Sequence, residues 1–335
     1  MSLQEQVIQI LKENNFNGTA LIAKGDHILV QVAHGYRDME SNIPMTTDVV
    51  FRVGSITKQF TAVAILQQVE AGTIQLSDSI SKYISDVPYE HVVTIHHLLS
   101  NSSGIPNFDI HADYSDYLAS SNFHERMVRE VILPQPLHFT PGERFEYSSS
   151  GFIILTHILE QVTGKPYHTY LDEHIFQPLR MTHSGFHFLD TTEELFSSLY
   201  DLVENQIVLA QPFDMRIASG AGGLYSCAMD LYRWNRALME STIVPRTQRD
   251  AMQKVHAVIN ETGGYGYGVL SVQHQNNEHN HQLVYHPGNG PGVFGQTMVI
   301  DNDVQITLLS NINDGKTFRP CFNAILECTL KYLDE

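Results

Sequence analysis

The segments that predict β-strands lie at the two ends of this chain, whereas the middle of the chain predicts mainly helices. Two strands are predicted within residues 18–36, on either side of a turn at Lys24-Gly25-Asp26. From Val53 to about Phe213 the apolar pattern is mostly helical. Further strands are predicted within residues 264–272, 281–288, 295–301 and 304–311.

Each terminus adds a predicted helix, within residues 1–16 and 322–333. The simplest architecture joins strands from both ends into one antiparallel sheet that the terminal helices cover. We therefore expect an α+β fold, with an inserted, mostly helical domain. Residues 1–60 and 215–335 would form the α/β sheet domain, residues 61–214 the helical domain, and the active site would lie in the crevice between them.

Charge and cysteine content exclude several classes of function. The formal net charge is −17, from 20 basic and 37 acidic residues, which disfavours a nucleic-acid partner. Three cysteines argue against a disulfide scaffold. No run of apolar residues is long enough for a transmembrane segment, and the first residues do not resemble a signal peptide. The expected location is cytoplasmic as the sequence stands, or exported if a leader was removed.

A serine and a lysine lie three positions apart at the head of the apolar segment 51–72, FRVGSITKQFTAVAILQQVEAG. In a helix, residues with this spacing share a face, with Cβ atoms about 5–6 Å apart. Ser55 needs a base to become a nucleophile. Lys58 could be that base if burial lowered its pKa from about 10.4. A helix-capping serine followed by a solvated lysine gives the same pattern.

Two more segments carry candidate residues. Tyr147 lies in the serine-rich stretch of TPGERFEYSSSGFIIL, residues 140–155, just before an apolar helix. His286 and Gly288 lie in the glycine-rich stretch YHPGNGPGVFGQTMVI, residues 285–300. Taken singly, the tyrosine could be a packing residue and the glycine-rich stretch an ordinary loop.

Together, these segments resemble the serine β-lactamase and penicillin-binding protein superfamily, in its class C β-lactamase, D-alanyl-D-alanine carboxypeptidase and esterase branch. The resemblance covers nearly the whole chain and implies a β-lactamase/transpeptidase-like fold. Three further segments follow in the family's order: HHLLSNSSGIPNF at 96–108, FQPLRMTHSGF at 176–186 and GAGGLYSCAMDLYRWNRAL at 220–238.

The resemblance implies a role for each matching residue. Ser55 matches the acylated nucleophile, and Lys58 and Tyr147 match the groups that handle its proton. Which of the two is the general base stays open. Tyr147 is expected to have a lowered pKa beside the lysine ammonium. The substrate and the oxyanion would be bound by four further residues: Ser149, His286, Gly288 and Asn289.

The sequence departs from the family pattern at three positions in these segments. Tyr147-Ser148-Ser149 stands where the family has Tyr-x-Asn, so a side-chain amide that could pair with a substrate amide is lost. Pro287 has no hydroxyl where the family often has threonine. His286 replaces a permanent cation with a titratable one. These changes weaken the case for efficient β-lactam hydrolysis.

The sequence therefore predicts a serine hydrolase that forms an acyl-enzyme with a small ester, amide or D-amino-acid peptide. The alternative is a penicillin-recognising binding or sensor protein with little or no turnover. No cofactor is expected. The chain has 18 histidines, but none lies in a recognised metal-binding motif, so no metal site is predicted.

Overall fold

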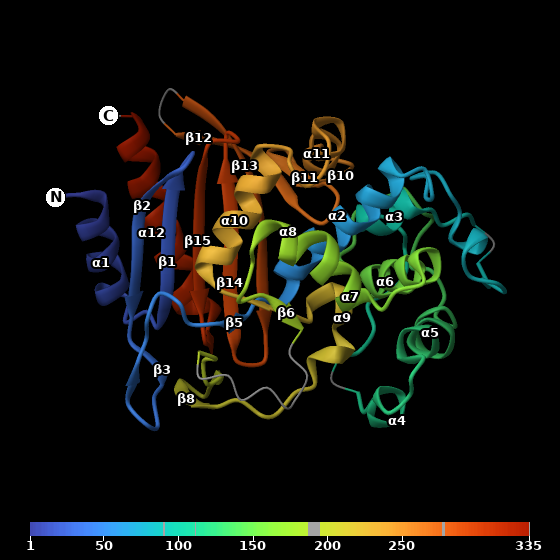
Figure 1. Cartoon of the computed structure of the whole chain (residues 1–335), viewed down its shortest axis with the longest axis horizontal. Helices are drawn as coiled ribbons and strands as arrows, with labels where there is room; N and C mark the ends of the chain where they lie inside the picture. The colour runs from blue at the N-terminus through green and yellow to red at the C-terminus, as the bar shows by residue number, and fades with distance from the viewer. Residues whose placement is uncertain (90, 111, 187–194, 277–278, 335) are drawn as a thin grey trace.

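A large antiparallel sheet is built from both ends of the chain (Figure 1). The structure is a computed structural model that describes residues 1–89, 91–110, 112–186, 195–276 and 279–334. The sheet has eight strands, and every neighbouring pair is antiparallel. In sheet order they are β10 (Ala257–Asn260), β11 (Gly263–Tyr265), β12 (Leu270–Asn276), β13 (His279–Gly290), β14 (Val293–Ile300), β15 (Val304–Ser310), β1 (Gly18–Lys24) and β2 (His27–His34).

Helices cover both faces of this sheet, which explains why its central strands are buried. Successive side chains of a strand point to opposite faces. In β1, Ala20 and Ile22 pack into the core beside α1 (Leu3–Glu13) and α12 (Gly315–Asp334), whereas Leu21 and Ala23 join the core on the other side. On that side α10 (Ala228–Met239) packs on β1 and β15 (Figure 1).

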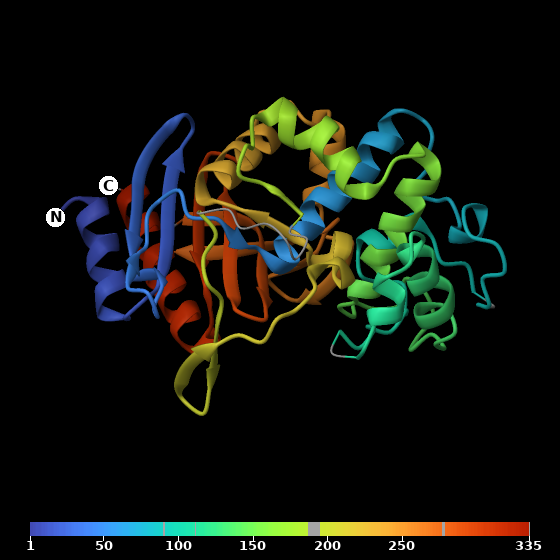
Figure 2. The same cartoon turned by 60° about the horizontal axis from the view of Figure 1, so that its bottom comes forward.

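The helical part lies at the end of the molecule opposite α1 and α12 (Figure 2). Its central element is α2 (Thr57–Glu70), in which all ten residues from Thr57 to Leu66 are buried. A helix buried on all sides must be surrounded by other elements. Those that contact α2 include α6 (Ser149–Thr163), α7 (Tyr167–Leu171), α9 (Ser219–Gly222) and α11 (Arg246–Gln253).

Short strands and helices complete the described chain. Three small sheets contain β16 (Ile312–Asn313), β7 (Tyr200–Val203) and β8 (Gln206–Leu209); β3 (Tyr36–Asp38) and β4 (Ile43–Pro44); and β5 (Phe51–Arg52), β9 (Leu224–Ser226) and β6 (Gly185–Phe186). The remaining α-helices are α3 (Ile95–Leu99), α4 (Ser115–Leu118), α5 (Phe123–Arg126) and α8 (Gln177–Leu179). The short strands β6, β7 and β8 interrupt the part of the chain that was predicted to be mostly helical.

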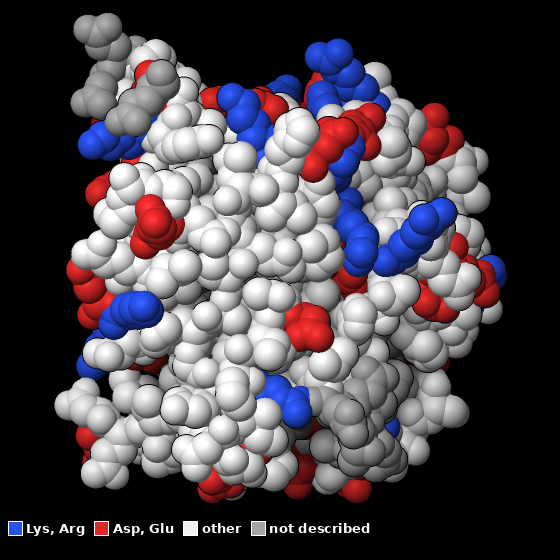
Figure 3. All heavy atoms as spheres, turned by 60° about the vertical axis from the view of Figure 1, so that its left-hand side comes forward, with Lys and Arg blue, Asp and Glu red and all other residues white. Residues whose placement is uncertain are grey.

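The predicted α+β class is confirmed, because one antiparallel sheet carries the terminal helices and the middle of the chain adds a helical part. The exact domain boundaries, at residues 60 and 214, stay a prediction. None of the helices in the described part of the chain combines the length and the apolar character that a membrane span needs. The face viewed in Figure 3 shows acidic and basic side chains interspersed among uncharged ones.

Candidate active site

Ser55 lies at the start of the buried central helix, on a sharp turn of the backbone. Gly54 has a φ of +51°, a conformation that favours glycine, and it begins a short 3₁₀ helix, η1 (Gly54–Ile56), that leads into α2. The Thr57 hydroxyl donates to the Gly54 carbonyl oxygen at 2.7 Å and accepts from the Leu224 N–H at 3.1 Å. This turn is therefore fixed by bonds on both sides, and it presents Ser55 at the helix entrance.

The Lys58 amine is completely buried and lies against Ser55, one turn along the chain. Its Nζ is 3.0 Å from Ser55 Oγ, 3.2 Å from Ser149 Oγ and 2.7 Å from the carbonyl oxygen of Ala221. Among the described residues no carboxylate forms an ion pair with it. Burial without a counter-charge lowers the pKa of Lys58 to about 7, because the charged form is poorly solvated.

Tyr147 contacts Ser55 from a distant part of the chain. Its hydroxyl donates to Ser55 Oγ at 2.8 Å, and the Lys58 amine lies 4.8 Å from the centre of its ring. The residue is 38% exposed, which leaves part of the ring open to solvent. Burial of the hydroxyl raises the pKa of Tyr147 well above its ordinary value, so the expectation of a lowered pKa was wrong.

Ser149 lies beside Lys58 at the first position of α6. Its hydroxyl accepts a hydrogen bond from the amine, so the serine that stands where the family has asparagine contacts the lysine. Its backbone N–H donates to the side-chain oxygen of Asn107 at 2.7 Å. Asn107 was not predicted as a site residue, although it lies within the segment 96–108 that resembles the family.

His286 is buried at the end of β13 and does not act as a cation. Its Nδ1 lies 2.6 Å from the carbonyl oxygen of Pro287, and its Nε2 lies 2.9 Å from the Tyr265 hydroxyl. The carbonyl can only accept, so Nδ1 carries the proton and Nε2 accepts from the tyrosine. Burial, aided by the nearby Lys58 charge, lowers the pKa of His286 to about 3. The expectation of a titratable cation here was wrong, because the ring stays neutral at physiological pH.

The last residues of β13 lie directly against the Ser55 turn. Pairing with β12 ends at Tyr285, whereas pairing with β14 continues to Gly290, so the end of β13 is paired on one side only. A Cβ on Gly54 would lie 2.9 Å from the backbone nitrogen of Asn289. The Asn289 side chain lines a groove against α12, on the opposite face of the sheet. Only the backbone of this residue is therefore directed to the Ser55 side.

Gly288 is predicted to tolerate no side chain. A Cβ there would lie 1.9 Å from the carbonyl oxygen of Val53, so Gly288→Ala must push β13 away from the Ser55 turn. We expect Gly288→Ala to lower the melting temperature by several degrees, since overpacking costs about 1–3 kcal/mol. Gly290→Ala is the matched control, because its nearest atom would be 3.8 Å away. Equal melting temperatures for the two variants would contradict this account.

A group of possible metal ligands lies elsewhere, at His183, Cys227 and Asp230. The Asp230 carboxylate already accepts bonds from the His183 N–H at 2.7 Å, the Ser184 hydroxyl at 2.9 Å and Arg233 at 2.5 Å. Burial raises the pKa of the Cys227 thiol to about 11, which disfavours the thiolate that binds metals. These contacts describe a buried structural carboxylate.

Comparison with known proteins gives a consistent result over nearly the whole chain. The sequence matches the Beta-lactamase family over residues 3–327. It is 29% identical over 326 residues to PbpX of Bacillus subtilis (strain 168), whose description as a penicillin-binding protein is itself provisional. That match covers 96% of this chain and 78% of PbpX.

Solved structures match the fold equally well. A penicillin-binding protein from Bacillus halodurans superposes with a TM-score of 0.80 at 26% identity, covering 98% of both chains. A D-amino acid amidase from Ochrobactrum anthropi SV3 superposes with a TM-score of 0.83 at 22% identity, covering 98% of this chain and 99% of the amidase. The second likeness concerns the fold alone.

Proposed function

The chain belongs to the β-lactamase family, and on that basis we propose that it is a serine hydrolase with Ser55 as its acylated nucleophile. The observation that carries this proposal is the convergence of Lys58 and Tyr147 on one oxygen atom, at 3.0 Å and 2.8 Å from Ser55 Oγ. A nucleophile within hydrogen-bond reach of a base is the arrangement that covalent catalysis needs.

Lys58 is proposed as the general base. With a pKa of about 7, a substantial share of the amine is neutral near neutral pH. A neutral amine has two N–H donors and one lone pair. One N–H must donate to the Ala221 carbonyl oxygen, which can only accept, and the other can donate to Ser149 Oγ. The lone pair is then left for the Ser55 hydroxyl proton.

Tyr147 is proposed as the acid that protonates the leaving group. Its raised pKa keeps the phenol protonated, so it has a proton to give. As Ser55 Oγ attacks the substrate carbonyl, its proton passes to Lys58. When the bond to the leaving group breaks, Tyr147 supplies a proton to the leaving group and recovers one from Lys58. Water then attacks the acyl-enzyme, with the same groups acting in reverse, and frees Ser55.

The backbone N–H groups of Ser55 and Asn289 are proposed to bind the oxyanion of the tetrahedral intermediate. Gly54 and Gly288 support this role, because each would collide with the facing backbone if it carried a Cβ. The close approach brings the end of β13 to the serine turn. Fixed N–H donors at the developing negative charge provide a large part of the catalysis in acyl transfer.

The substrate class that we propose is a small ester, amide or D-amino-acid peptide. Ser149 has its hydroxyl engaged with Lys58 and offers no side-chain amide to a substrate, which disfavours efficient β-lactam hydrolysis. Because a D-amino acid amidase shares the fold, D-amino-acid amides are included among the substrates to be tested.

A panel of substrates tests this proposal: p-nitrophenyl esters, D-amino-acid amides, a D-Ala-D-Ala peptide and a chromogenic cephalosporin. We expect steady-state turnover of at least one ester or amide, with a transient acyl adduct mapped to Ser55 by mass spectrometry. An adduct at Ser55 that stays intact for hours, without turnover, would instead identify a sensor. Turnover without any adduct at Ser55 would refute the nucleophile.

The pH dependence of the reaction should follow Lys58. The protonated amine has no lone pair for the Ser55 proton, so kcat/KM should rise with pH through about 7 and level off above it. His286 should not change the shape of the kcat/KM profile between pH 5 and 8, because its pKa is about 3. The measurement is kcat/KM for the best ester between pH 5 and 9. A profile that is flat between pH 6 and 8 would contradict the assignment of Lys58.

A further inference from the structure

The helical part contains a cavity that is separate from the Ser55 site. Its volume is about 460 Å³, and it is bordered by α5, α6 and the turn that enters α9. Part of its wall is apolar, with Leu118, Phe123, Pro166 and Phe186 among the lining residues. Ser55, Lys58 and Tyr147 do not line it. A cavity of this size matches those that hold small molecules in other proteins.

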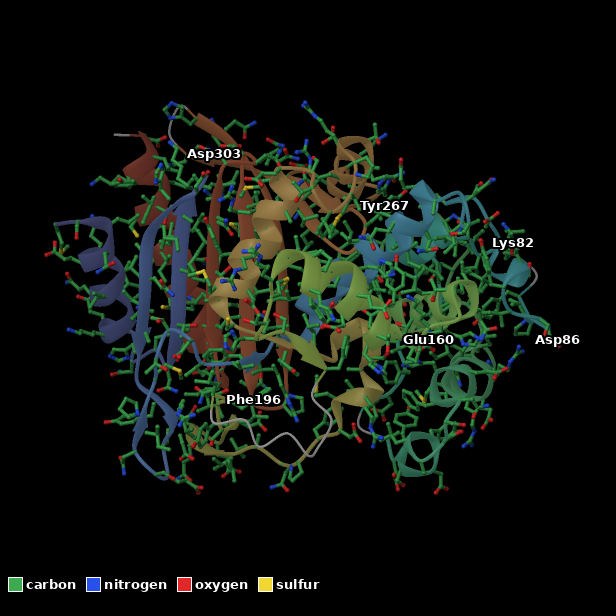
Figure 4. All side chains as sticks on the ribbon, viewed as in Figure 1. Lys82, Asp86, Glu160, Phe196, Tyr267 and Asp303 are labelled. Atoms are coloured by element: carbon green, nitrogen blue, oxygen red, sulfur yellow. The ribbon has the colours of Figure 1, made fainter. Side chains whose placement is uncertain are left out.

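Three polar side chains of this cavity form a continuous hydrogen-bonded chain. Ser219 Oγ lies 2.5 Å from His124 Nε2, and His124 Nδ1 lies 2.8 Å from Glu160 Oε2. Figure 4 labels Glu160, on α6. Its other oxygen, Oε1, accepts from the backbone N–H of Tyr167 at 2.9 Å, which fixes the carboxylate. All three side chains line the cavity.

The direction of each hydrogen bond follows from the chemistry of the groups. Burial raises the pKa of Glu160, but the bonds from His124 and Tyr167 outweigh it and leave the pKa below its ordinary value. An ionised carboxylate only accepts, so His124 Nδ1 carries a proton. When the imidazole is neutral, Nε2 is the acceptor and the Ser219 hydroxyl donates to it, which is the form that can take the Ser219 proton. A serine, a histidine and a carboxylate in this order are the parts of an activated serine nucleophile.

The backbone of Ser219 has an unusual conformation. Its φ is +37°, which residues with a Cβ rarely adopt, and its carbonyl oxygen accepts from the Gly223 N–H at 2.7 Å. The residue is 4% exposed, so its hydroxyl is reached from the cavity rather than from open solvent. Three separate segments, near residues 124, 160 and 219, are needed to assemble this arrangement.

We propose that Ser219, His124 and Glu160 form a second nucleophilic site, which accepts the acyl group of a small apolar ester from this cavity. His124 Nε2 takes the Ser219 proton as Oγ bonds to the ester carbonyl carbon. The bond to the leaving alcohol then breaks, and the alcohol leaves with the proton from Nε2. Water hydrolyses the acyl-serine by the same transfers in reverse. Glu160 is a positioning residue that holds the His124 ring in the required tautomer.

The test is labelling of the full chain with a small alkyl fluorophosphonate, followed by peptide mapping. In Ser55→Ala we expect one label per chain on the peptide that contains Ser219, and in Ser55→Ala/Ser219→Ala we expect none. His124→Gln, made in the Ser55→Ala chain, should slow labelling of Ser219 by about 10²-fold, the smaller effect typical of losing a general base. Ser121→Ala is the matched control, since Ser121 lines the same cavity but is not one of the three hydrogen-bonded residues Ser219, His124 and Glu160.

Glu160→Gln, also made in the Ser55→Ala chain, separates a positioning role from a structural one. It keeps the shape of the side chain but removes its charge, so it should slow labelling of Ser219 and shift the pH profile of the labelling rate. Circular dichroism confirms that each variant is folded. A folded Ser55→Ala chain without label at Ser219, or labelling that His124→Gln leaves unchanged, would overturn the proposal. Because each label is assigned to its peptide, failure at Ser219 is distinguished from failure at Ser55.

Discussion

In the Ser55→Ala protein, turnover of the best substrate of the panel is expected to fall by about 10⁴-fold or more, as happens when a serine nucleophile is removed. The substitution deletes the oxygen on which Lys58 and Tyr147 converge, so no acyl-enzyme can form at this position. The fold should persist, because only one half-buried hydroxyl is lost. The measurement is kcat/KM together with the mass of the protein during turnover.

Two comparisons sharpen this experiment. Ser41→Ala removes the hydroxyl of an exposed serine in the turn between β3 and β4 and should leave kcat/KM unchanged. Any residual ester hydrolysis in Ser55→Ala should disappear in Ser55→Ala/Ser219→Ala, if the second site hydrolyses esters slowly. A Ser55→Ala protein that keeps most of the original activity in the absence of Ser219 would refute the proposed mechanism.

Lys58→Met is expected to lower kcat by about 10²- to 10⁴-fold, the range for loss of a general base, with little change in KM. Methionine is similar in length and suits a buried environment, so the helix entrance should stay intact. What is lost is the lone pair that receives the Ser55 proton. Steady-state kinetics of the ester, together with the rate of adduct formation at Ser55, measure the effect.

Lys82→Met is the matched control, because Lys82 is half exposed and pairs with Asp78 on the surface. It should leave both kcat and KM within about twofold, as exposed ion pairs contribute little. If Lys58→Met kept the wild-type kcat and still showed a rise of activity through pH 7, another group would have to be the base. Tyr147 would then be the first candidate, since its hydroxyl also contacts Ser55 Oγ.

The local parts of this site could be predicted from the sequence, because they depend on short-range geometry. The spacing of Ser55 and Lys58 places both on one helical face, and Gly54 allows the sharp turn before them. The strands at both chain ends likewise predicted the sheet that now carries β13. In each case the pattern within a few residues determines the local conformation, whereas the pairing of β1 with β15 joins distant segments.

The electrostatic properties could not be predicted, because they depend on contacts between distant segments. Lys58 donates to the carbonyl oxygen of Ala221, 163 residues away, and no backbone carbonyl has a sequence signature. The pKa of Tyr147 was expected to be lowered by Lys58, but burial of the hydroxyl dominates and raises it. His286 was expected to be a titratable cation, because its burial beside Tyr265 cannot be seen in a single stretch of sequence.

The hydrogen bonds among Ser219, His124 and Glu160 could not be predicted from the sequence for the same reason. His124 was one of 18 histidines, and it lies in no motif that predicts catalysis. Glu160 is 36 residues away from it and Ser219 is 95 residues away, so no spacing rule connects them. Their side chains come within hydrogen-bond distance only when the helices pack together.

The buried Lys58 amine also has a thermodynamic consequence for the whole protein. In the unfolded chain its pKa is about 10.5, and in the folded protein it is about 7. Below pH 7 the amine is protonated in both the folded and the unfolded state. Burial of the charged ammonium then lowers the free energy of unfolding by its full amount. Between pH 7 and 10.5 the unfolded chain holds more protons, so the contribution of this residue to the free energy of unfolding rises with pH. The buried Lys58 amine therefore destabilises the folded protein less at alkaline pH than at acidic pH. The residue proposed as the general base thus also makes the protein more resistant to unfolding in base than in acid.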